Sequence, residues 1–489
     1  MKTVLIIGGG VSGLSAGIYA RYHGYNAVIC ERHKLAGGNL TGWTREGYHI
    51  DNCIHWLTGT NPNTKTYQTW KELGALGQVD VLQPDVLYTC EKDGQRFSLY
   101  RDLDKLQSEM LDLSPADEKQ IQKLVQTVRT LQAVSGVRGF SLKDVLSLPA
   151  LVPYVRLSTG ELSQRFKHPL LQTFFSCFIG TEFSALALLF VFATFCGDNG
   201  GLPKGGSLAM AQRMEQRFTS LGGQLLLGKE VAEIILQQST AVGVRFLDGS
   251  TLSADYIVCA CEPTVTFEKL LKRDMPKALQ KQYTTEPRFS SWHCAFACDL
   301  STLPFSGDLI LCLDEKEQKI LQTKHLIIRE FSHEPSFAPK GKNVIQTMVF
   351  VDENAAKEFI VLKQTPDKYR RKKLALCKAV EKILTARFPA FSDKLRRLDV
   401  WTPATYQRYT LSPTGSYMSF ILRKNKLPVA KSAWISSTKN VLLATQWQQA
   451  PGGLPTAADM GKHAIAQIVR KDARAIKLPI FGKKRKARV

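Results

Sequence analysis

The sequence predicts an α/β fold in which a parallel sheet forms one domain and a second domain mixes strands and helices. Three features of the 489 residues predict it. Residues 3–7 are a short apolar run rich in β-branched side chains, which is typical of a strand buried on both faces of a parallel sheet. Similar runs occur far along the chain, at residues 255–260 and 440–444. Residues 265–435 alternate strand-like and loop-like stretches, which indicates a second, mostly antiparallel sheet with one clear helix at 368–387.

A glycine-rich loop, residues 8–13, follows the first strand and leads into a predicted helix at residues 14–22. Gly8 permits a tight turn, Gly10 lets a pyrophosphate approach the backbone, and Gly13 lets the helix pack closely against the sheet. Unpaired N–H groups and the dipole at the N-terminus of that helix favour an anion. The predicted phosphate-binding residues are therefore Gly8, Gly10, Val11, Ser12 and Gly13.

A second strand, residues 26–30, ends at Glu31, which is followed by Arg32. A carboxylate at this distance from the glycine loop is placed to accept hydrogen bonds from ribose hydroxyl groups. Strand, loop, helix and acid together predict a Rossmann-like unit that binds a dinucleotide. The alternative is a glycine-rich turn in an unrelated α/β domain. No second motif of this kind follows in a strand–helix setting, which argues against a separate NAD(P)H domain.

The next segment contains Gly37, Gly38, Asn39 and Leu40, followed by residues 47–51. A second glycine pair after the acidic residue is not part of a nicotinamide-nucleotide motif. Here the sequence resembles the large family of flavoprotein amine oxidases and carotenoid-type desaturases. The resemblance implies one non-covalent FAD, with this segment along its diphosphate and ribityl chain and continuing under the isoalloxazine ring. The family usually has arginine at the position of Asn39, so one charge-assisted phosphate contact is expected to be missing.

Two later segments resemble the same family. Residues 201–262 are similar to the part in which backbone groups, expected here at Val231, bind adenine. Residues 440–470 resemble the final strand, turn and helix, whose first N–H groups point at the flavin edge that is anionic when reduced. The family's acidic residue before this turn is replaced by Ala444-Thr445, which weakens the expected hold on the ribityl chain. The residues that the resemblance places here against FAD are Thr445, Gly453, Leu454, Pro455 and Thr456.

Residues 336–341 and 402–417 resemble a turn and a stretch shared by phytoene desaturases, carotenoid isomerases and retinol saturases. Judged without the resemblance, residues 402–410 are interpreted as part of a substrate-domain strand with solvent-facing polar side chains. The resemblance implies hydride transfer at flavin N5 to or from a carbon atom of the substrate. We name no catalytic acid or base. The side chains expected near the ring are His55, Trp56 and Trp447, although His55 could also be a turn residue and Trp56 a core residue.

The resemblance and the composition shifts predict two discontinuous domains and a tail. The predicted FAD-binding domain comprises residues 1–65, 197–265 and 436–470. The predicted α+β substrate domain, with its mixed or antiparallel sheet and its helical lobe, comprises residues 66–196 and 266–435. The basic tail comprises residues 471–489.

The helical lobe is predicted from residues 60–175, which are mostly helical in pattern. One helix has apolar positions at 121, 124, 125, 128 and 131 and begins near Ser114 as a cap. The most apolar stretch, residues 170–196, is interrupted by Gly180 and Glu182. We interpret this stretch as core, or as the wall of a lipophilic tunnel, and the lobe as a cover over a substrate channel.

Composition narrows the function classes. With 44% hydrophobic and 22% charged residues the chain is an ordinary globular protein, and nothing resembles a signal peptide. No apolar run reaches the ~18 residues that a spanning helix needs. The 11 cysteines show neither CxxC pairs nor metal-ligand spacing, so we expect buried thiols in a reducing cytoplasm and no metal site.

The formal charge of +22 is partly concentrated in the tail, where Leu478, Ile480 and Phe481 precede the basic residues 483–486. This pairing suits an anionic membrane surface. The alternatives are a solvated tail and, since no recognised binding module accompanies the charge, less readily nucleic acid. We therefore expect a cytoplasmic protein that lies peripherally at the inner face of the membrane, with no nucleic-acid partner. The sequence gives no oligomeric state.

Three functions remain open. The first is an FAD-dependent oxidoreductase that desaturates, saturates or isomerises C–C and C=C bonds of an apolar, isoprenoid- or lipid-like substrate. The second is a flavin amine oxidase, which the strong positive charge disfavours because its substrate is cationic. The third is an FAD-binding protein without enzymatic activity, or a nucleic-acid-binding protein.

Overall fold

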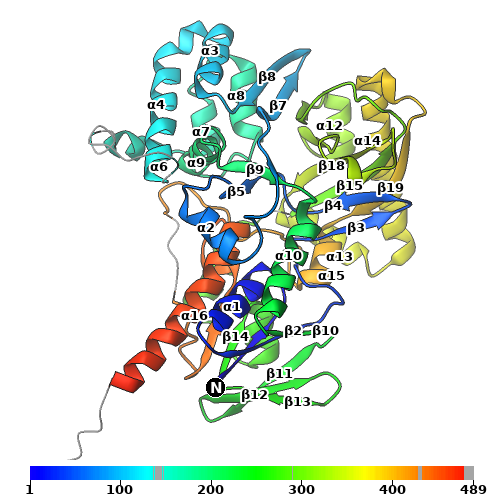
Figure 1. The fold of residues 1–489 in the computed structure, drawn as a ribbon. Coiled ribbons are helices and arrows are strands. Elements are labelled where there is room, and N and C mark those ends of the chain that lie inside the picture. Colours follow the sequence, from blue (N-terminus) through cyan, green and yellow to red (C-terminus); the bar gives the residue numbers. More distant parts are fainter. Residues whose placement is uncertain (136, 138–145, 147, 289, 428–431, 478–489) are drawn as a thin grey trace, which may run out of the picture.

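The computed structural model describes residues 1–477 except 136, 138–145, 147, 289 and 428–431 (Figure 1). A five-stranded parallel sheet forms the lower part of Figure 1, with its strands in the order β10, β2, β1, β14 and β20. Its strands are β1 (Thr3–Ile7), β2 (Asn26–Glu31), β10 (Gln224–Leu227), β14 (Tyr256–Cys259) and β20 (Val441–Leu443). The predicted fold class is confirmed, because strands from three distant segments build one sheet.

Helices α1 (Val11–Tyr22), α10 (Gly206–Ser220) and α16 (Leu454–Lys477) pack on one face of this sheet. α1 begins at Val11, three residues before the predicted start at residue 14. A Cβ atom on Gly13 would lie 1.9 Å from the Gly8 carbonyl oxygen, and one on Gly461 of α16 would lie 2.4 Å from the Ser12 oxygen. Glycines at these two positions therefore let α1 lie close to the sheet and to α16, as predicted for Gly13.

A small antiparallel sheet packs on the opposite face of the parallel sheet. Its strands are β11 (Val231–Gln237), β12 (Thr240–Phe246) and β13 (Thr251–Ser253). The hairpin β3 (Gly42–Arg45) and β4 (Tyr48–Asp51) leads from the nucleotide domain toward the second domain. The π-helix at Val265–Leu270 and helix α11 (Lys277–Thr285) follow β14.

A seven-stranded mixed sheet forms the second domain. Its order is β19 (Leu395–Trp401), β15 (Ser290–Cys298), β18 (Asn343–Val351), β17 (His325–Glu330), β16 (Asp308–Cys312), β7 (Val86–Lys92) and β8 (Gln95–Tyr100). All neighbours are antiparallel except β16 and β7. One face packs against α12 (Glu315–Leu321), α13 (Glu353–Leu362) and α14 (Pro366–Arg387), and part of the other face meets the helical lobe.

Two expectations for this domain were wrong. Residues 402–410, interpreted as a strand, form helix α15 (Pro403–Thr410). Thr402 stands before a proline at the first helical position, and its N–H donates to the Thr405 hydroxyl, so the local sequence starts a helix. The single predicted helix, at 368–387, is joined by α11, α12, α13 and α15.

The helical lobe lies at the upper left of Figure 1. It contains α3 (Leu103–Leu113), α4 (Glu118–Val134), α6 (Val152–Val155), α7 (Thr159–Ser163), α8 (Pro169–Cys177) and α9 (Ala185–Phe195). The predicted apolar face of α4 is confirmed, but a 3₁₀ turn at Pro115–Asp117 separates Ser114 from that helix. The β7–β8 hairpin, within the region predicted as mostly helical, adds two strands to the seven-stranded sheet.

Short connections join the lobe to the nucleotide domain. β9 (Gly200–Pro203) pairs with β5 (Leu57–Thr58) and with β6 (Val81–Leu82), and α2 (Lys65–Glu72) follows β5. At the other end of the chain, α16 continues through Lys477, so residues 471–477 of the predicted tail are helical. The rest of that tail, residues 478–489, lies outside the described residues.

Candidate active site

A cavity of ≈ 850 Å³ extends from the glycine loop of the nucleotide domain to the helical lobe. Ligand sites commonly span about 300–1,000 Å³, so this one is large. With the exception of Gly13, every residue predicted to lie near FAD lines it. These residues are Gly8, Gly10, Val11, Ser12, Glu31, Arg32, Gly37, Gly38, Asn39, Leu40, His55, Trp56, Val231, Thr445, Trp447, Gly453, Leu454, Pro455 and Thr456. Their contacts with FAD itself stay predictions.

The glycine loop fits a diphosphate group. Gly10 stands at the N-cap of α1, where no side chain caps the helix and the first turn carries no acidic residue. A Cβ atom on Gly10 would meet only Gly38 Cα and the Gly37 oxygen, at 3.9 and 4.0 Å, so it would enter the space between the two glycine segments. Backbone N–H groups of the first helical turn lack partners inside the helix and favour an anion there.

Glu31 and Arg32 lie beside this loop, as predicted. The Glu31 carboxylate, 6% exposed, accepts hydrogen bonds from Gly9 N at 2.7 Å and His33 N at 2.8 Å. A carboxylate has about four acceptor positions, so these bonds leave room for ribose hydroxyl groups. Arg32 Nε lies 3.5 Å from Glu230, while its buried Nη1 makes no hydrogen bond within the described chain. That unpaired donor fits a polar ligand in the cavity.

The turn before α16 is held by its own side chains. Thr445 Oγ1 accepts from Trp447 N at 3.0 Å, and Gln448 Oε1 accepts from Thr445 N at 2.8 Å. Gln446 bridges Gly453 N, at 2.9 Å, and the Tyr417 carbonyl oxygen, at 3.1 Å. Thr445 stands at the position where the resemblance places the family's acidic residue, and Gln446 follows it, so these two polar side chains shape the turn.

His55 and Tyr88 meet midway along the cavity, with His55 Nδ1 2.7 Å from the Tyr88 hydroxyl. Burial, and then the positive charge of Arg329, hold the pKa of His55 well below its ordinary value, whereas burial raises the pKa of Tyr88. Arg329 Nη2 donates to the Ile54 carbonyl oxygen at 2.6 Å, next to His55. Both cavity side chains are therefore neutral near pH 7.

A second polar group lines the same region. His293 Nε2 lies 2.7 Å from the Ser291 hydroxyl and 3.2 Å from that of Tyr406, which also lies 3.1 Å from Asn52 Oδ1. The His293 ring stacks on Trp401 with centroids 4.5 Å apart. Burial lowers the pKa of His293 to about 3 and raises that of Tyr406. The group consists of buried but uncharged side chains.

Sequence reasoning missed four cavity side chains, namely Tyr88, His293, Tyr406 and Tyr417. The stretch 402–417 already carried Tyr406 and Tyr417, and assigning it to a helix would have shown that Tyr406 turns inward. No local signal distinguished Tyr88 or His293, because each stands in a strand whose neighbour in space comes from a distant segment.

The rest of the cavity is an apolar arm between the helical lobe and the seven-stranded sheet. From the lobe it is lined by Leu131, Phe178, Ile179, Phe183, Leu186, Ala187, Phe190 and Val191. From the sheet it is lined by Ile310, Ile327, Met348 and Phe350. Trp56, Tyr88 and Phe178 form a cluster of three rings, with centroids 6.4 Å (Trp56–Tyr88), 6.1 Å (Trp56–Phe178) and 5.4 Å (Tyr88–Phe178) apart. The stretch 170–196 is thus both core and cavity wall.

The comparisons with known proteins agree with this geometry. The family described as flavin containing amine oxidoreductase matches residues 11–469. The chain belongs to this family. It is therefore a flavin-dependent oxidoreductase, and its cofactor is FAD. Among the residues that the structure describes, no group of three or more His, Cys, Asp or Glu side chains is placed to hold a metal ion.

Relatives and solved structures show how distant the similarities are. The chain is 23% identical to the prolycopene isomerase of Daucus carota, with 84% of this chain and 71% of that protein covered. It is also 23% identical to a neurosporene-forming phytoene desaturase of Rhodobacter capsulatus, with 89% and 86% covered. The cyclohexylamine oxidase of Brevibacterium oxydans has the same fold, with a TM-score of 0.58 and 15% identity over 97% of this chain and 100% of that one.

Proposed function

We propose that this enzyme desaturates, saturates or isomerises carbon–carbon bonds of an apolar, isoprenoid- or lipid-like substrate. The observation that supports it is the continuity of the cavity. The end lined by Gly8, Gly10, Gly37 and Gly38, here called the glycine cradle, opens directly into the apolar arm. An arm lined by leucine, isoleucine and phenylalanine side chains favours a ligand that gains by leaving water.

When bound, FAD supplies hydride transfer at N5. The residues of this chain contribute an apolar, largely dry surrounding, and His55, His293, Tyr88 and Tyr406 remain neutral in it because burial disfavours their charged forms. A substrate without charge can lie against these side chains at little electrostatic cost. The walls also exclude water from the reacting carbon atoms.

The names of two relatives support the substrate class. One is a prolycopene isomerase and the other a phytoene desaturase, and each aligns over more than 80% of this chain. Both names describe changes at carbon–carbon bonds of carotenoids. We propose the same class of substrate here and leave the direction of the reaction to experiment.

An amine substrate suits the cavity less well. The lining carboxylates belong to the nucleotide domain: Glu31 ends β2, Glu262 follows β14, and Glu230 precedes β11. Within the described lining, the apolar arm carries no acidic side chain that could pair with a cationic amine. The likeness to cyclohexylamine oxidase, at 15% identity, concerns the fold.

The test uses purified, FAD-loaded protein with phytoene or prolycopene incorporated in phosphatidylcholine liposomes. The expected result is a product with an altered polyene absorbance, separated by chromatography, from at least one of them. Putrescine and cyclohexylamine serve as the comparison, with hydrogen peroxide release as the readout. Turnover of an amine with no change in either polyene would overturn the proposal.

We also propose that the enzyme works in the cytoplasm, peripherally at the inner face of an anionic membrane. The support is the charge of +22 and the sequence of the tail, where apolar residues precede a basic cluster. In the described part of the chain, no helix combines the length and apolarity needed to cross a bilayer. A substrate of this class would enter the cavity from the membrane surface.

A further inference from the structure

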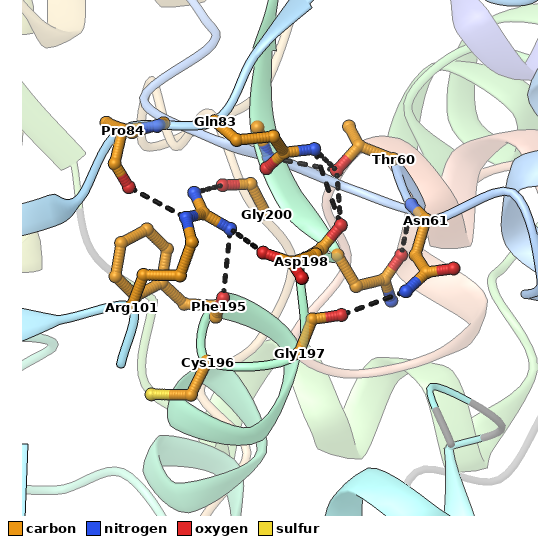
Figure 2. Close-up of polar contacts among 12 residues, drawn as sticks. Thr60, Asn61, Gln83, Pro84, Arg101, Phe195, Cys196, Gly197, Asp198 and Gly200 are labelled. Carbon is orange, nitrogen blue, oxygen red and sulfur yellow. Dashed lines mark hydrogen bonds and ion pairs between the residues drawn. The ribbon is translucent and has the colours of Figure 1, made fainter. Parts of the chain in front are cut away.

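Helix α9 ends in an unusual set of contacts. The last carbonyl groups of a helix have no partners inside it. At and beyond the end of α9, the carbonyl oxygens of residues 195–199 each accept a hydrogen bond from another segment. Figure 2 shows the bonds to Phe195, Gly197 and Asp198. The donors are Arg101, Gln132, Asn61, Gln83 with Thr60, and Gly59 N, respectively. α9 is therefore held at its C-terminal end from outside.

Arg101 donates hydrogen bonds to three carbonyl oxygens here, one at the end of α9 and two in neighbouring segments. Its side chain, 12% exposed, donates through Nε to the Pro84 oxygen at 2.8 Å and through Nη1 to the Phe195 oxygen at 3.1 Å. Nη2 reaches the Gly200 oxygen at 3.4 Å, and the guanidinium lies 4.4 Å from the Phe195 ring centroid. A cation at this place also interacts favourably with the C-terminal end of the helix dipole.

Both walls of the cavity meet this network. On one side, α9 presents Leu186, Ala187, Phe190, Val191 and Thr194 to the cavity, and Thr194 directly precedes the bonded Phe195. On the other side, Trp56 stands behind Gly200, where an added Cβ atom would lie 3.3 Å from Phe195 Cα and 3.6 Å from Trp56 Cδ1. Gly200 also pairs with Thr58 through the β5–β9 ladder. The guanidinium of Arg101 thus connects α9, through the Phe195 oxygen, to the segment around Gly200 against which Trp56 lies.

We propose that Arg101 is a positioning residue for the substrate cavity, because it fixes the end of α9 against β9 and so sets the gap between α9 and Trp56. The inference rests on the proposed function only in taking the ligand to be an apolar polyene. Arg101 itself does not line the cavity. It acts through Phe195 and Gly200, whose carbonyl oxygens it holds.

We attribute this role to the hydrogen bonds that Arg101 donates to carbonyl oxygens, and not to its ion pair with Asp198. Arg101 Nη1 lies 3.2 Å from Asp198 Oδ1, but the Asp198 side chain is 68% exposed. Exposed ion pairs contribute little to stability, whereas leaving buried acceptors unpaired costs more per group. Asp198→Asn is therefore a matched control that removes the opposite charge and keeps the guanidinium and its carbonyl partners.

The test measures binding of cis-parinaric acid, a fluorescent polyene, to FAD-loaded protein at a temperature well below unfolding. For Arg101→Met we expect a dissociation constant raised on the order of tenfold, with altered energy transfer from tryptophan to the probe. FAD affinity should stay within about twofold, since the network does not touch the glycine cradle. Arg101→Lys should have a dissociation constant between those of the unmodified protein and Arg101→Met, because a single ammonium group cannot reproduce the hydrogen bonds of the planar guanidinium. Asp198→Asn should bind like the unmodified protein.

A residue that only stabilises the fold would lower the unfolding temperature and leave the probe constant unchanged. Such a result for Arg101→Met would overturn the proposal. If Arg101→Met does not fold, Arg101→Lys and Asn61→Ala, which removes the donor to the Gly197 oxygen, decide the matter by the same readout. Unchanged probe binding in both would likewise refute it.

Failure of the proposed function looks different. If the unmodified protein binds the probe but converts neither phytoene nor prolycopene, the proposed reaction is wrong. The comparison of probe binding among the Arg101 variants still tests the positioning role. If the reaction occurs and the variants bind the probe equally, only the positioning role of Arg101 is refuted. The two proposals can therefore fail independently of each other.

Discussion

The Tyr88 hydroxyl lies 2.7 Å from His55 Nδ1 and joins two domains at the middle of the cavity. Tyr88 comes from β7 of the seven-stranded sheet, and His55 stands two residues before β5, on the segment that leads out of the nucleotide domain. The apolar arm and the cofactor end therefore share a hydrogen bond between neutral side chains.

Tyr88→Phe should lower the free energy of unfolding by about 1–3 kcal/mol, because it leaves a buried imidazole nitrogen without its partner. Urea denaturation measures this. Tyr409→Phe is the matched control, since Tyr409 is 47% exposed and its loss should change stability by less than about 0.5 kcal/mol. Equal effects of the two substitutions would show that the Tyr88–His55 contact contributes nothing.

His293 should make the protein less stable in acid. The pKa of His293 falls to about 3 in the folded chain, against an ordinary value of 6.5, chiefly because of burial. Between these values the unfolded chain binds the proton and the folded one does not, so stability falls as pH drops below about 6.5, by up to about 1.4 kcal/mol per pH unit. His293→Gln should therefore lose less stability than the unmodified protein between pH 7.5 and pH 5. His23→Gln, at an exposed position, is the control for the loss of a histidine side chain as such.

Two glycines of one loop should fail in different ways. Gly10→Val places a side chain in the open space where we expect the pyrophosphate, so the protein should fold and contain no FAD. Gly13→Ala places a Cβ atom 1.9 Å from the Gly8 oxygen, so it should impair folding itself. Flavin absorbance and thermal unfolding separate the two. A Gly10→Val protein isolated with full flavin content would refute the phosphate assignment.

Ala187→Trp should block the apolar arm. Ala187 lines the cavity from α9, and an indole there would occupy the space between the lobe and the sheet. Polyene binding should fall at least tenfold, while FAD content stays normal because the cradle lies at the other end. Leu247→Trp, at a position 68% exposed and away from the cavity, is the control. Unchanged polyene binding would place the ligand elsewhere.

Removal of the tail should weaken binding to anionic liposomes. The structure sets the cut after Lys477, because Asp472 of α16 accepts hydrogen bonds from Lys2, Tyr25 and Tyr256. A chain ending at residue 470 would lose these contacts as well as the tail. Sedimentation with phosphatidylglycerol liposomes should show less pelleting of the 1–477 chain. High salt should weaken the full-length interaction without abolishing it, as the Debye length falls from about 10 to 3 Å. Equal pelleting of both chains would refute the role of the tail.

The nucleotide domain could be predicted from sequence because its chemistry is local. The glycine loop, Glu31 and the turn before α16 can each be recognised from a few consecutive residues, and all of them line one cavity. Residues 402–410 were misread because threonine and tyrosine, which favour strands, make up much of the stretch, and only the Thr402-Pro403 start marks a helix.

The middle of the cavity could not be predicted in this way. His293 reaches Tyr406 across more than a hundred positions, and Tyr88 reaches His55 only because β7 pairs in parallel with β16. Arg101 donates hydrogen bonds to carbonyl oxygens of three distant elements, namely the loop at Pro84, the end of α9 at Phe195 and β9 at Gly200. Such contacts depend on register between distant strands, which no local pattern encodes.

The order of strands in the parallel sheet has a consequence for how the chain is made. β1 is the third strand in space, whereas β20 and α16 are among the last elements to leave the ribosome. At about 5–20 residues per second, roughly 20–90 s pass between the synthesis of β1 and that of β20. During that time α1 lacks the helix against which it packs, and β14, once it is made, has an unpaired edge until β20 follows. Because residues 453–456, predicted to contact FAD, stand at the start of α16, we expect cofactor uptake to be a late event that requires a completed domain.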